Sequence, residues 1–191
     1  MRAFIAVEVP PAAIESLVAA QAALRTMIGR LPVKWTRPEG MHLTLRFVGD
    51  VPEDAAEPLC EAVGRACAML RPFQIELSGG LSCFPSAGRA RIIWARFGGD
   101  LETLQDLHRV VASASDRFVA RRDDRDFVPH LTLGRVGEAR GDERKALAAA
   151  ISIVRTPQAQ WRVGSVRVMR SFLKPEGAEH ALLAECPLKS D

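Results

Sequence analysis

The sequence contains no tyrosine, few histidines and cysteines, and no long uninterrupted hydrophobic run. A helix that crosses a bilayer needs roughly 18 or more apolar residues in succession, and no segment is that long. The apolar start, Met1–Val9, is too short for a signal peptide and is interrupted by Glu8. We therefore expect no membrane segment and predict that residues 2–8 form the first strand.

The cysteines lack the spacing of a metal-binding cluster. There is no Cys-x-x-Cys pair, and no histidine stands at zinc-finger spacing from Cys60, Cys67, Cys83 or Cys186. Cys60 and Cys67 are placed to share one face of a predicted helix. We expect reduced cysteines in the core of a cytoplasmic protein that uses no metal and no cofactor.

A large excess of one charge is also absent. The net charge is +3 and the isoelectric point is near 8.9. A protein that coats a nucleic-acid duplex neutralises many phosphates, which needs a larger positive excess. The modest excess fits a small phosphate-bearing ligand or an RNA end better. At 191 residues, with 48% hydrophobic residues, the chain is expected to form one domain or one two-lobed domain over residues 1–191.

The hydrophobic spacing predicts alternating strands and helices without a long linker. Strands are expected at 2–8, 42–48, 73–77, 91–97, 130–137, 161–172 and 181–186, helices at 11–29, 53–70, 101–119 and 143–153, and loops or turns at 32–40, 79–88, 121–126 and 174–177. No glycine-rich phosphate loop follows the first strand, which disfavours a doubly wound parallel sheet. We predict an α+β fold with two pseudo-symmetric lobes, whose antiparallel-rich sheets face a central cleft and whose helices lie outside.

One short sequence occurs twice. Residues 42–49 read His-Leu-Thr-Leu-Arg-Phe-Val-Gly and residues 130–137 read His-Leu-Thr-Leu-Gly-Arg-Val-Gly, identical at six of eight positions. A strand places alternate side chains on opposite faces. Each copy is therefore predicted to be a strand with leucines on its back and one imidazole and one hydroxyl on its front, with one copy in each lobe.

Two facing strands of this kind suit acid–base chemistry at a phosphate. Histidine titrates near neutral pH, so a neutral imidazole can take a proton from water while a protonated one gives a proton to a leaving oxygen. His42 and His130 are the candidates for this pair. Thr44 and Thr132 can hydrogen-bond the non-bridging phosphate oxygens. The alternatives are structural histidines or a metal site, although no Asp, Glu or Cys accompanies either copy.

The two copies resemble the paired His-x-Thr-x motifs of the two-histidine (2H) phosphoesterases. Further matches to the bacterial and archaeal RNA 2′,3′-cyclic phosphodiesterases, first named 2′-5′ RNA ligases, are the N-terminal strand, Trp35, Cys83-Phe84-Pro85, Arg91-Ile92-Ile93-Trp94, Phe127 and Pro129. The resemblance implies metal-independent hydrolysis of an RNA 2′,3′-cyclic phosphate to a 2′-phosphomonoester. It also implies that His42 is the proton donor and His130 the acceptor, and that reverse 2′-5′ ligation exchanges their roles.

Four other side chains are candidate substrate contacts. Arg46 continues the predicted front face of the first strand. In the second copy this position is Gly134, and a bulge there is expected to swing Arg135 toward the cleft, where the resemblance implies an arginine. Phe84 and Trp94 are candidates for stacking on a base.

The two remaining histidines are predicted to lie outside the site. His108 is expected on a helix surface, and His180 on an exposed strand edge, where the resembling family has an aromatic residue. The expected partner is RNA with a cyclic phosphate end, or a small cyclic nucleotide, bound by a monomer. Two rivals stay open: a cyclic phosphodiesterase for ADP-ribose 1″,2″-cyclic phosphate or 2′-5′ oligonucleotides, and a non-catalytic RNA-end-binding module.

Overall fold

The computed structural model describes residues 1–119, 126–174 and 177–189, so most of the charged loop predicted at 121–126 and the middle of the turn predicted at 174–177 lie outside the described residues. The elements are β1 Arg2–Val7, α1 Pro11–Ile28, β2 Val33–Trp35, η1 Pro38–Gly40, β3 Leu43–Asp50, η2 Glu53–Ala55, α2 Ala56–Cys67, β4 Phe73–Phe84, η3 Ala87–Arg89, β5 Ile92–Gly99, α3 Leu101–Ser115, η4 Asp116–Phe118, β6 His130–Val136, α4 Gly141–Ile153, β7 Ala159–Val163, β8 Ser165–Lys174 and β9 Gly177–Pro187.

The strands form two antiparallel sheets, each of which contains one copy of the repeated sequence. The first sheet has the order β3-β1-β8-β9 and the second has the order β2-β6-β5-β4-β7. Within the described residues, every strand pairing is antiparallel. The predicted α+β fold with antiparallel sheets is confirmed.

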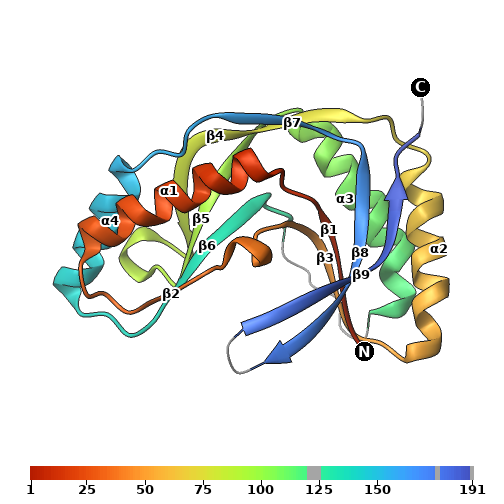
Figure 1. The fold of residues 1–191 in the computed structure, drawn as a ribbon, viewed down its shortest axis with the longest axis horizontal. Helices are drawn as coiled ribbons and strands as arrows, with labels where there is room; N and C mark the ends of the chain where they lie inside the picture. Colours follow the sequence, from red (N-terminus) through yellow and green to blue (C-terminus); the bar gives the residue numbers. More distant parts are fainter. Residues whose placement is uncertain (120–125, 175–176, 190–191) are drawn as a thin grey trace.

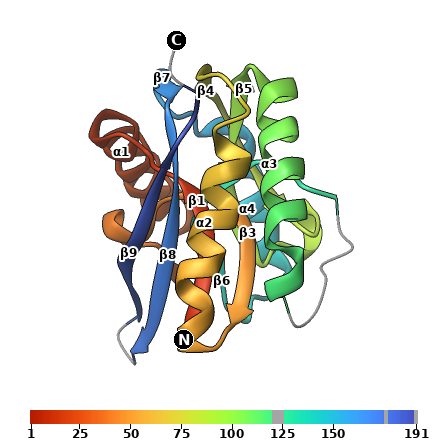
Figure 2. The same ribbon diagram turned by 90° about the vertical axis from the view of Figure 1, so that its right-hand side faces the viewer.

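The α-helices pack along the outer face of each sheet (Figure 1, Figure 2), although Ile14 near the start of α1 and the short η1 reach the inner side of the first sheet. Helices α2 and α3 pack together behind the first sheet, and α1 and α4 pack together behind the second. The opposite faces, called helix-free because no α-helix packs along them, turn toward one another across the middle of the molecule (Figure 1). This arrangement leaves one face of each sheet available for polar side chains.

The chain crosses repeatedly between the two sheets. Strand β1 lies in the first sheet, but the helix that follows it packs behind the second sheet, and β3 then returns to the first. Strand β1 is also central, between β3 and β8, and its residues after Arg2 are all buried. The apolar run at the start of the sequence is therefore explained by a strand with neighbours on both sides.

Several predicted boundaries differ from the structure. Strand β4 continues to Phe84 through the stretch predicted as a loop, because a register shift between Leu77 and Leu81, with Gly79 at φ 78°, lets the strand bend and resume its pairing with β5. The stretch 32–40 contains the short strand β2, which pairs with β6.

No helix in the described part of the chain is long and apolar enough to cross a membrane.

Candidate active site

The first copy of the motif runs along β3, at the edge of the first sheet. Leu43 and Leu45 are buried in the core, and Thr44 is half-buried and pairs with Ala6 of β1. Directly opposed residues of an antiparallel pair share a face, so Thr44 lies on the face of Ala6, and Phe4, two residues earlier on that same face of β1, stacks on the His42 ring. The predicted front of this strand, with the imidazole and the hydroxyl on one side, is confirmed.

A bulge after Thr44 changes the direction of the next side chains. Thr44 pairs with Ala6 and Arg46 pairs with Ile5, so Leu45 is the extra residue. Ile5 is fully buried on the core side, and Arg46 joins it there with its Nη2 2.9 Å from Oδ1 of Asp116 behind the sheet. The prediction that Arg46 continues the front face is wrong, because strict alternation fails at a bulge.

The second copy runs along β6 with the same construction. His130 pairs with Arg96 of β5 and Thr132 pairs with Trp94, so all four share a face. Leu131 and Leu133 are fully buried on the other side. The second half of the site therefore lies on the helix-free face of the second sheet.

A bulge beside Gly134 is present, as predicted, with Leu133 as the extra residue. Gly134 pairs with Ile93 on the core side, and Arg135 pairs with Ile92 on the face that carries Thr132. The register therefore assigns Arg135 to the front face, as expected, and its contact with substrate stays a prediction. Its other neighbour across the strands is Lys34 of β2, so two cations stand side by side at this end of the site.

The bulge in the second copy is fixed from behind. Gln21, a buried residue of α1, donates hydrogen bonds of 2.8 Å from its Nε2 to the carbonyl oxygens of Leu133 and Thr36. A Cβ atom at Gly134 would lie 2.7 Å from Cγ1 of Val33, so only glycine fits there without displacing β2. The backbone that aims His130 and Thr132 is thus held by a helix and a neighbouring strand.

The His130 ring is oriented by the residues that precede it. Its Nδ1 lies 2.7 Å from the carbonyl oxygen of Val128, and because a carbonyl can only accept, Nδ1 carries the proton. In the neutral ring Nε2 is then the basic nitrogen. The carbonyl of Phe127 accepts a 3.1 Å hydrogen bond from Nε2 of Gln105, and the His108 ring stacks on Phe127 at 4.1 Å. Helix α3 therefore supports the segment that sets the tautomer of His130.

Two aromatic rings surround His130. Phe84 and Trp94 stack on each other at 4.9 Å, and their centroids lie 5.2 and 5.9 Å from the His130 ring. Trp94 is 8% exposed, whereas Phe84 is half-buried. The structure brings both predicted aromatic residues to the site, and Phe84 offers the more accessible ring.

His42 lies in a more enclosed environment than His130. Its ring stacks on Phe4 at 4.7 Å, and the His180 ring stands edge-on 5.2 Å away. Burial, with a smaller contribution from neighbouring His180, lowers the pKa of His42 to about 4. In the empty site His42 is therefore neutral at pH 7.

Sequence reasoning misses two members of the site. His180 is expected on an exposed strand edge, but it is half-buried on β9 beside Phe4 and His42. Arg96 is not among the predicted residues, although it lies directly across from His130. The sequence hints at His180 only because the resembling family usually has an aromatic residue at that position. Arg96 is revealed by the register between β5 and β6, which the sequence does not show. His108, expected on the surface, is half-buried against Phe127.

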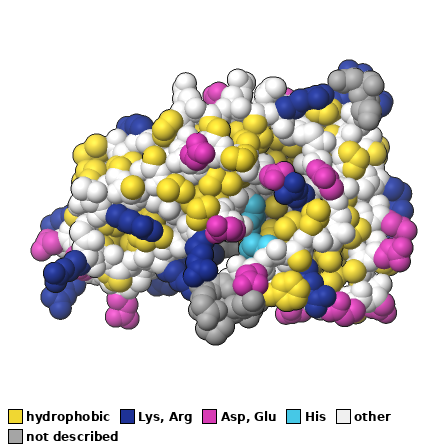
Figure 3. Space-filling model, in the orientation of Figure 1, with side chains coloured by type: hydrophobic (Ala, Val, Ile, Leu, Met, Phe, Trp, Pro, Cys, Tyr) yellow, Lys and Arg dark blue, Asp and Glu magenta, His cyan; other side chains and the backbone are white. Residues whose placement is uncertain are grey.

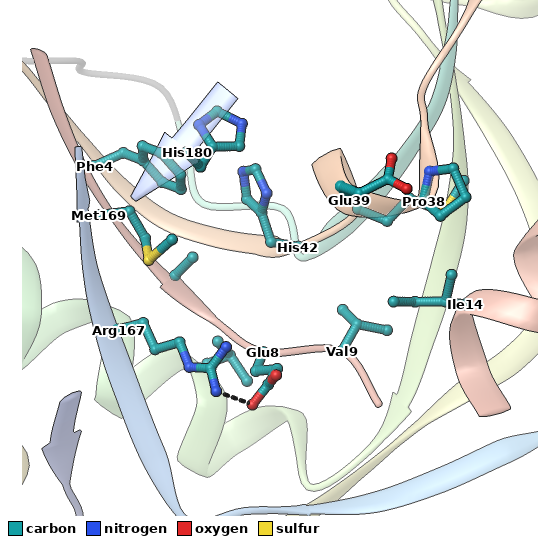
Figure 4. Close-up of a pocket in the computed structure, with 13 residues that line it drawn as sticks. Phe4, Glu8, Val9, Ile14, Pro38, Glu39, His42, Arg167, Met169 and His180 are labelled. Carbon is teal, nitrogen blue, oxygen red and sulfur yellow. Dashed lines mark ion pairs between the residues drawn. The ribbon is translucent and has the colours of Figure 1, made fainter. Parts of the chain in front are cut away.

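A cavity of about 220 Å³ opens beside His42 on the face of the first sheet (Figure 4). Figure 3 shows histidine side chains in a hollow of the molecular surface, bordered by acidic and basic groups. The cavity is lined by Phe4, Ala6, Val7, Glu8, Val9, Ile14, Pro38, Glu39, Met41, His42, Arg167, Met169 and His180. Among the described residues, no cluster of three His, Cys, Asp or Glu side chains is arranged to hold a metal ion.

Fold and site together define an α+β protein with one His-x-Thr-x strand in each of two sheets, the arrangement expected of a two-histidine phosphoesterase. The family model of LigT-like phosphoesterases matches residues 7–94 and 100–178. The chain belongs to this family, as the duplicated motif predicted.

Individual relatives cover almost the whole chain. An RNA 2′,3′-cyclic phosphodiesterase of Methanothermobacter thermautotrophicus is 33% identical over 180 residues, 93% of each protein. The crystal structure of a Thermus thermophilus protein has a TM-score of 0.78 at 27% identity and covers 100% of both chains. The E. coli LigT structure with 3′-AMP has a TM-score of 0.78 at 21% identity, covers 99% of this chain and 98% of its own, and shows likeness of fold.

Proposed function

We propose that this protein hydrolyses the 2′,3′-cyclic phosphate at RNA ends to a 2′-phosphomonoester, the activity named for its M. thermautotrophicus relative. The two lobes act as one unit, with His42 and Thr44 on one side of the phosphate and His130 and Thr132 on the other. The observation that carries the proposal is the repeated strand geometry. In both copies histidine and threonine share the helix-free face, and a bulge follows at the same position.

The chemistry is an in-line displacement at phosphorus. Water attacks the phosphorus atom and gives its proton to Nε2 of His130, whose Nδ1 proton is held by the Val128 carbonyl. The bond from phosphorus to the 3′-oxygen breaks, and that oxygen takes a proton from His42. The two threonine hydroxyls donate hydrogen bonds to the non-bridging oxygens. Each proton transfer contributes about 10²–10⁴ in rate.

The lowered pKa of His42 is compatible with the role of donor. An anion beside an imidazole stabilises the charged form, so a bound phosphodiester raises the pKa of His42 from its value of about 4 in the empty site. Substrate therefore brings the proton donor into its active protonation state. Among the described residues His42 has no carbonyl partner like that of His130, which supports assigning the donor role to His42 and the acceptor role to His130.

Further contacts would hold the RNA. Arg135, its neighbour Lys34 and Arg96 present cations on the face of His130, suited to phosphates of the preceding nucleotides. Phe84 offers a ring for stacking. We also propose that the protein acts as a monomer, without a metal ion, and catalyses 2′-5′ ligation when the same steps run in reverse. Its four free cysteines suit a reducing compartment such as the cytoplasm.

The test is product analysis with a chelator present. The protein is incubated in EDTA with an RNA oligonucleotide that ends in a 2′,3′-cyclic phosphate, and the position of the product phosphate is determined. We expect only the 2′-phosphomonoester. A 3′-phosphate product would refute the assignment of the leaving oxygen, and activity only after metal addition would refute metal independence.

Variants test the acid–base pair. His42→Ala and His130→Ala are each expected to lower kcat by about 10²–10⁴ without loss of the folded state, measured by circular dichroism. Thr26→Ala, at an exposed position of α1, controls for effects of expression and purification on a variant protein and should keep full activity. Full activity of either histidine variant would overturn the mechanism, and substrate binding without turnover by the unmodified protein would favour the binding-module alternative.

A further inference from the structure

The cavity beside His42 extends away from the proposed phosphate position. It is bounded at one end by His42 and His180, whereas Thr44, His130 and Thr132 do not line it (Figure 4). It therefore lies on the side of the proton donor. In the proposed reaction the 3′-oxygen faces His42, so the ribose that bears this oxygen lies at the mouth of the cavity.

The size and walls of the cavity suit one base. Its volume of about 220 Å³ is below the roughly 300–1,000 Å³ of pockets for drug-sized ligands. Its walls are mostly apolar, formed by β1, α1, η1 and β8, with the side chains of Val9 and Ile14 on one side and Met169 on the other (Figure 4). Apolar walls favour a flat ring. Besides Glu39 and the two histidines, the lining includes Glu8 and Arg167, polar groups that can identify the ring.

Those polar groups form an ion pair at the end opposite His180. Nη2 of Arg167 lies 2.5 Å from Oε2 of Glu8, and both residues line the cavity (Figure 4). The Glu8 carboxylate is about half exposed, so it keeps room for a second donor. Nε of Arg167 is buried and has no hydrogen-bond partner among the described residues. The Arg167 side chain as a whole is 32% exposed, so the pair offers an acceptor and, through the exposed part of the guanidinium, a donor next to each other.

We propose that this cavity receives the base of the nucleotide that carries the cyclic phosphate, and that Glu8 and Arg167 select guanine there. Guanine carries two neighbouring donors, N1–H and the N2 amino group, which match a carboxylate, and O6 and N7 beside them accept from a guanidinium. Adenine, cytosine and uracil lack the pair of adjacent donors. The inference rests on the proposed function for the position of the ribose, but the preference can be measured by binding alone.

The experiment compares the four 2′-nucleotides as ligands and the four 2′,3′-cyclic nucleotides as substrates. Calorimetry is expected to show guanosine 2′-phosphate binding about tenfold or more tightly than the other three, with the same order in kcat/KM. In Glu8→Gln the guanine advantage should fall to within about threefold, since an amide offers one acceptor in place of two. Arg167→Met should reduce it as well.

The matched control is Glu53→Gln. Glu53 also pairs with an arginine of β8, Arg170, at 2.9 Å, but neither residue lines the cavity. This variant should keep the guanine preference. Equal binding of the four nucleotides by the unmodified protein, or a guanine preference unchanged in Glu8→Gln, would overturn the inference. Absence of turnover together with preserved, Glu8-dependent guanine binding would instead refute the proposed reaction and leave the base site standing.

Discussion

The two copies of the motif share their first four residues and the same bulge, yet they differ at the next position. Arg46 in the first copy and Gly134 in the second both follow the bulged leucine, and both turn to the helix side of their sheet. At the first, a long side chain reaches Asp116. At the second, no side chain fits, because Val33 of β2 approaches too closely.

The difference follows from where each strand stands in its sheet. Strand β3 is an edge strand, so no further strand lies beside Arg46, and its side chain can reach Asp116 at the end of α3. Strand β6 has β2 beside it, and that neighbour occupies the corresponding space. On the front face the next position is Phe47 in one copy and Arg135 in the other. The proposed catalytic positions are therefore alike in the two copies but differently supported, and the second copy has a cation on its front face where the first has a phenyl ring.

The histidines themselves are the sharpest contrast. His42 is enclosed by Phe4 and His180 and has a pKa near 4. His130 instead donates a hydrogen bond from Nδ1 to the carbonyl oxygen of Val128. Binding an anionic diester should raise the pKa of His42 and should draw a proton from solution, so affinity should rise as the pH falls from about 7 toward about 4.

This predicts the largest effect. Calorimetry of a 2′,3′-cyclic nucleotide binding to inactive His130→Ala, in buffers of different ionisation enthalpy near pH 5.5, should show uptake of about one proton. The double variant His42→Asn/His130→Ala should show none. Equal uptake by both would place the titrating group elsewhere, with His180 the next candidate.

The second prediction concerns the support of the second copy. Gly134→Ala should lower the free energy of unfolding by about 1–3 kcal/mol, because the added methyl overlaps Val33 and forces β2 or β6 to shift. Gly141→Ala is the control, since nothing lies within 4 Å of a Cβ there. Denaturant unfolding measures both. If the Gly134→Ala protein were as stable as the unmodified one, β2 would be able to shift away from the added methyl group without a cost in free energy.

The third prediction concerns the support of the first copy. Arg46→Met should destabilise the protein by about 1–2 kcal/mol, less than a fully buried pair would, because Asp116 is 31% exposed. Combining it with Asp116→Asn in a double-mutant cycle should give a coupling energy of the same size. Strictly additive losses would show that the pair contributes nothing to the fold of β3.

The smallest effect is expected at α3, which supports the segment that precedes His130. Gln105→Ala removes the hydrogen bond to the Phe127 carbonyl and should lower kcat about two- to tenfold with little change in KM. Glu102→Ala, an exposed change on the same helix, should leave kcat unaltered. An equal change in both variants would point to a general effect on α3.

The parts of the site that alternation determines could be predicted from the sequence. The faces of His42, Thr44, His130 and Thr132 follow from period-two spacing over two short strands. The back-facing position of Arg46 does not, because the bulge at Leu45 depends on the pairing with β1, and no glycine marks it. Gly134 did mark its bulge, so the direction of Arg135 was predictable.

Contacts between distant segments were beyond sequence reasoning. The placement of His180 depends on β9 lying next to β8, and that of Arg96 depends on the register between β5 and β6. Neither relation leaves a local pattern. The continuation of β4 to Phe84 was hidden for another reason, since paired glycines at 79 and 80 are equally typical of a loop.

The crossing of the chain between sheets has a consequence for biogenesis. Strand β1 leaves the ribosome well before its partner β8, which begins at Ser165. All residues between the two strands must be synthesised before they can pair, and pairings between such distant segments form slowly. Until then β1 presents one unpaired apolar edge in the nascent chain, and a chaperone that binds exposed apolar strands can act there.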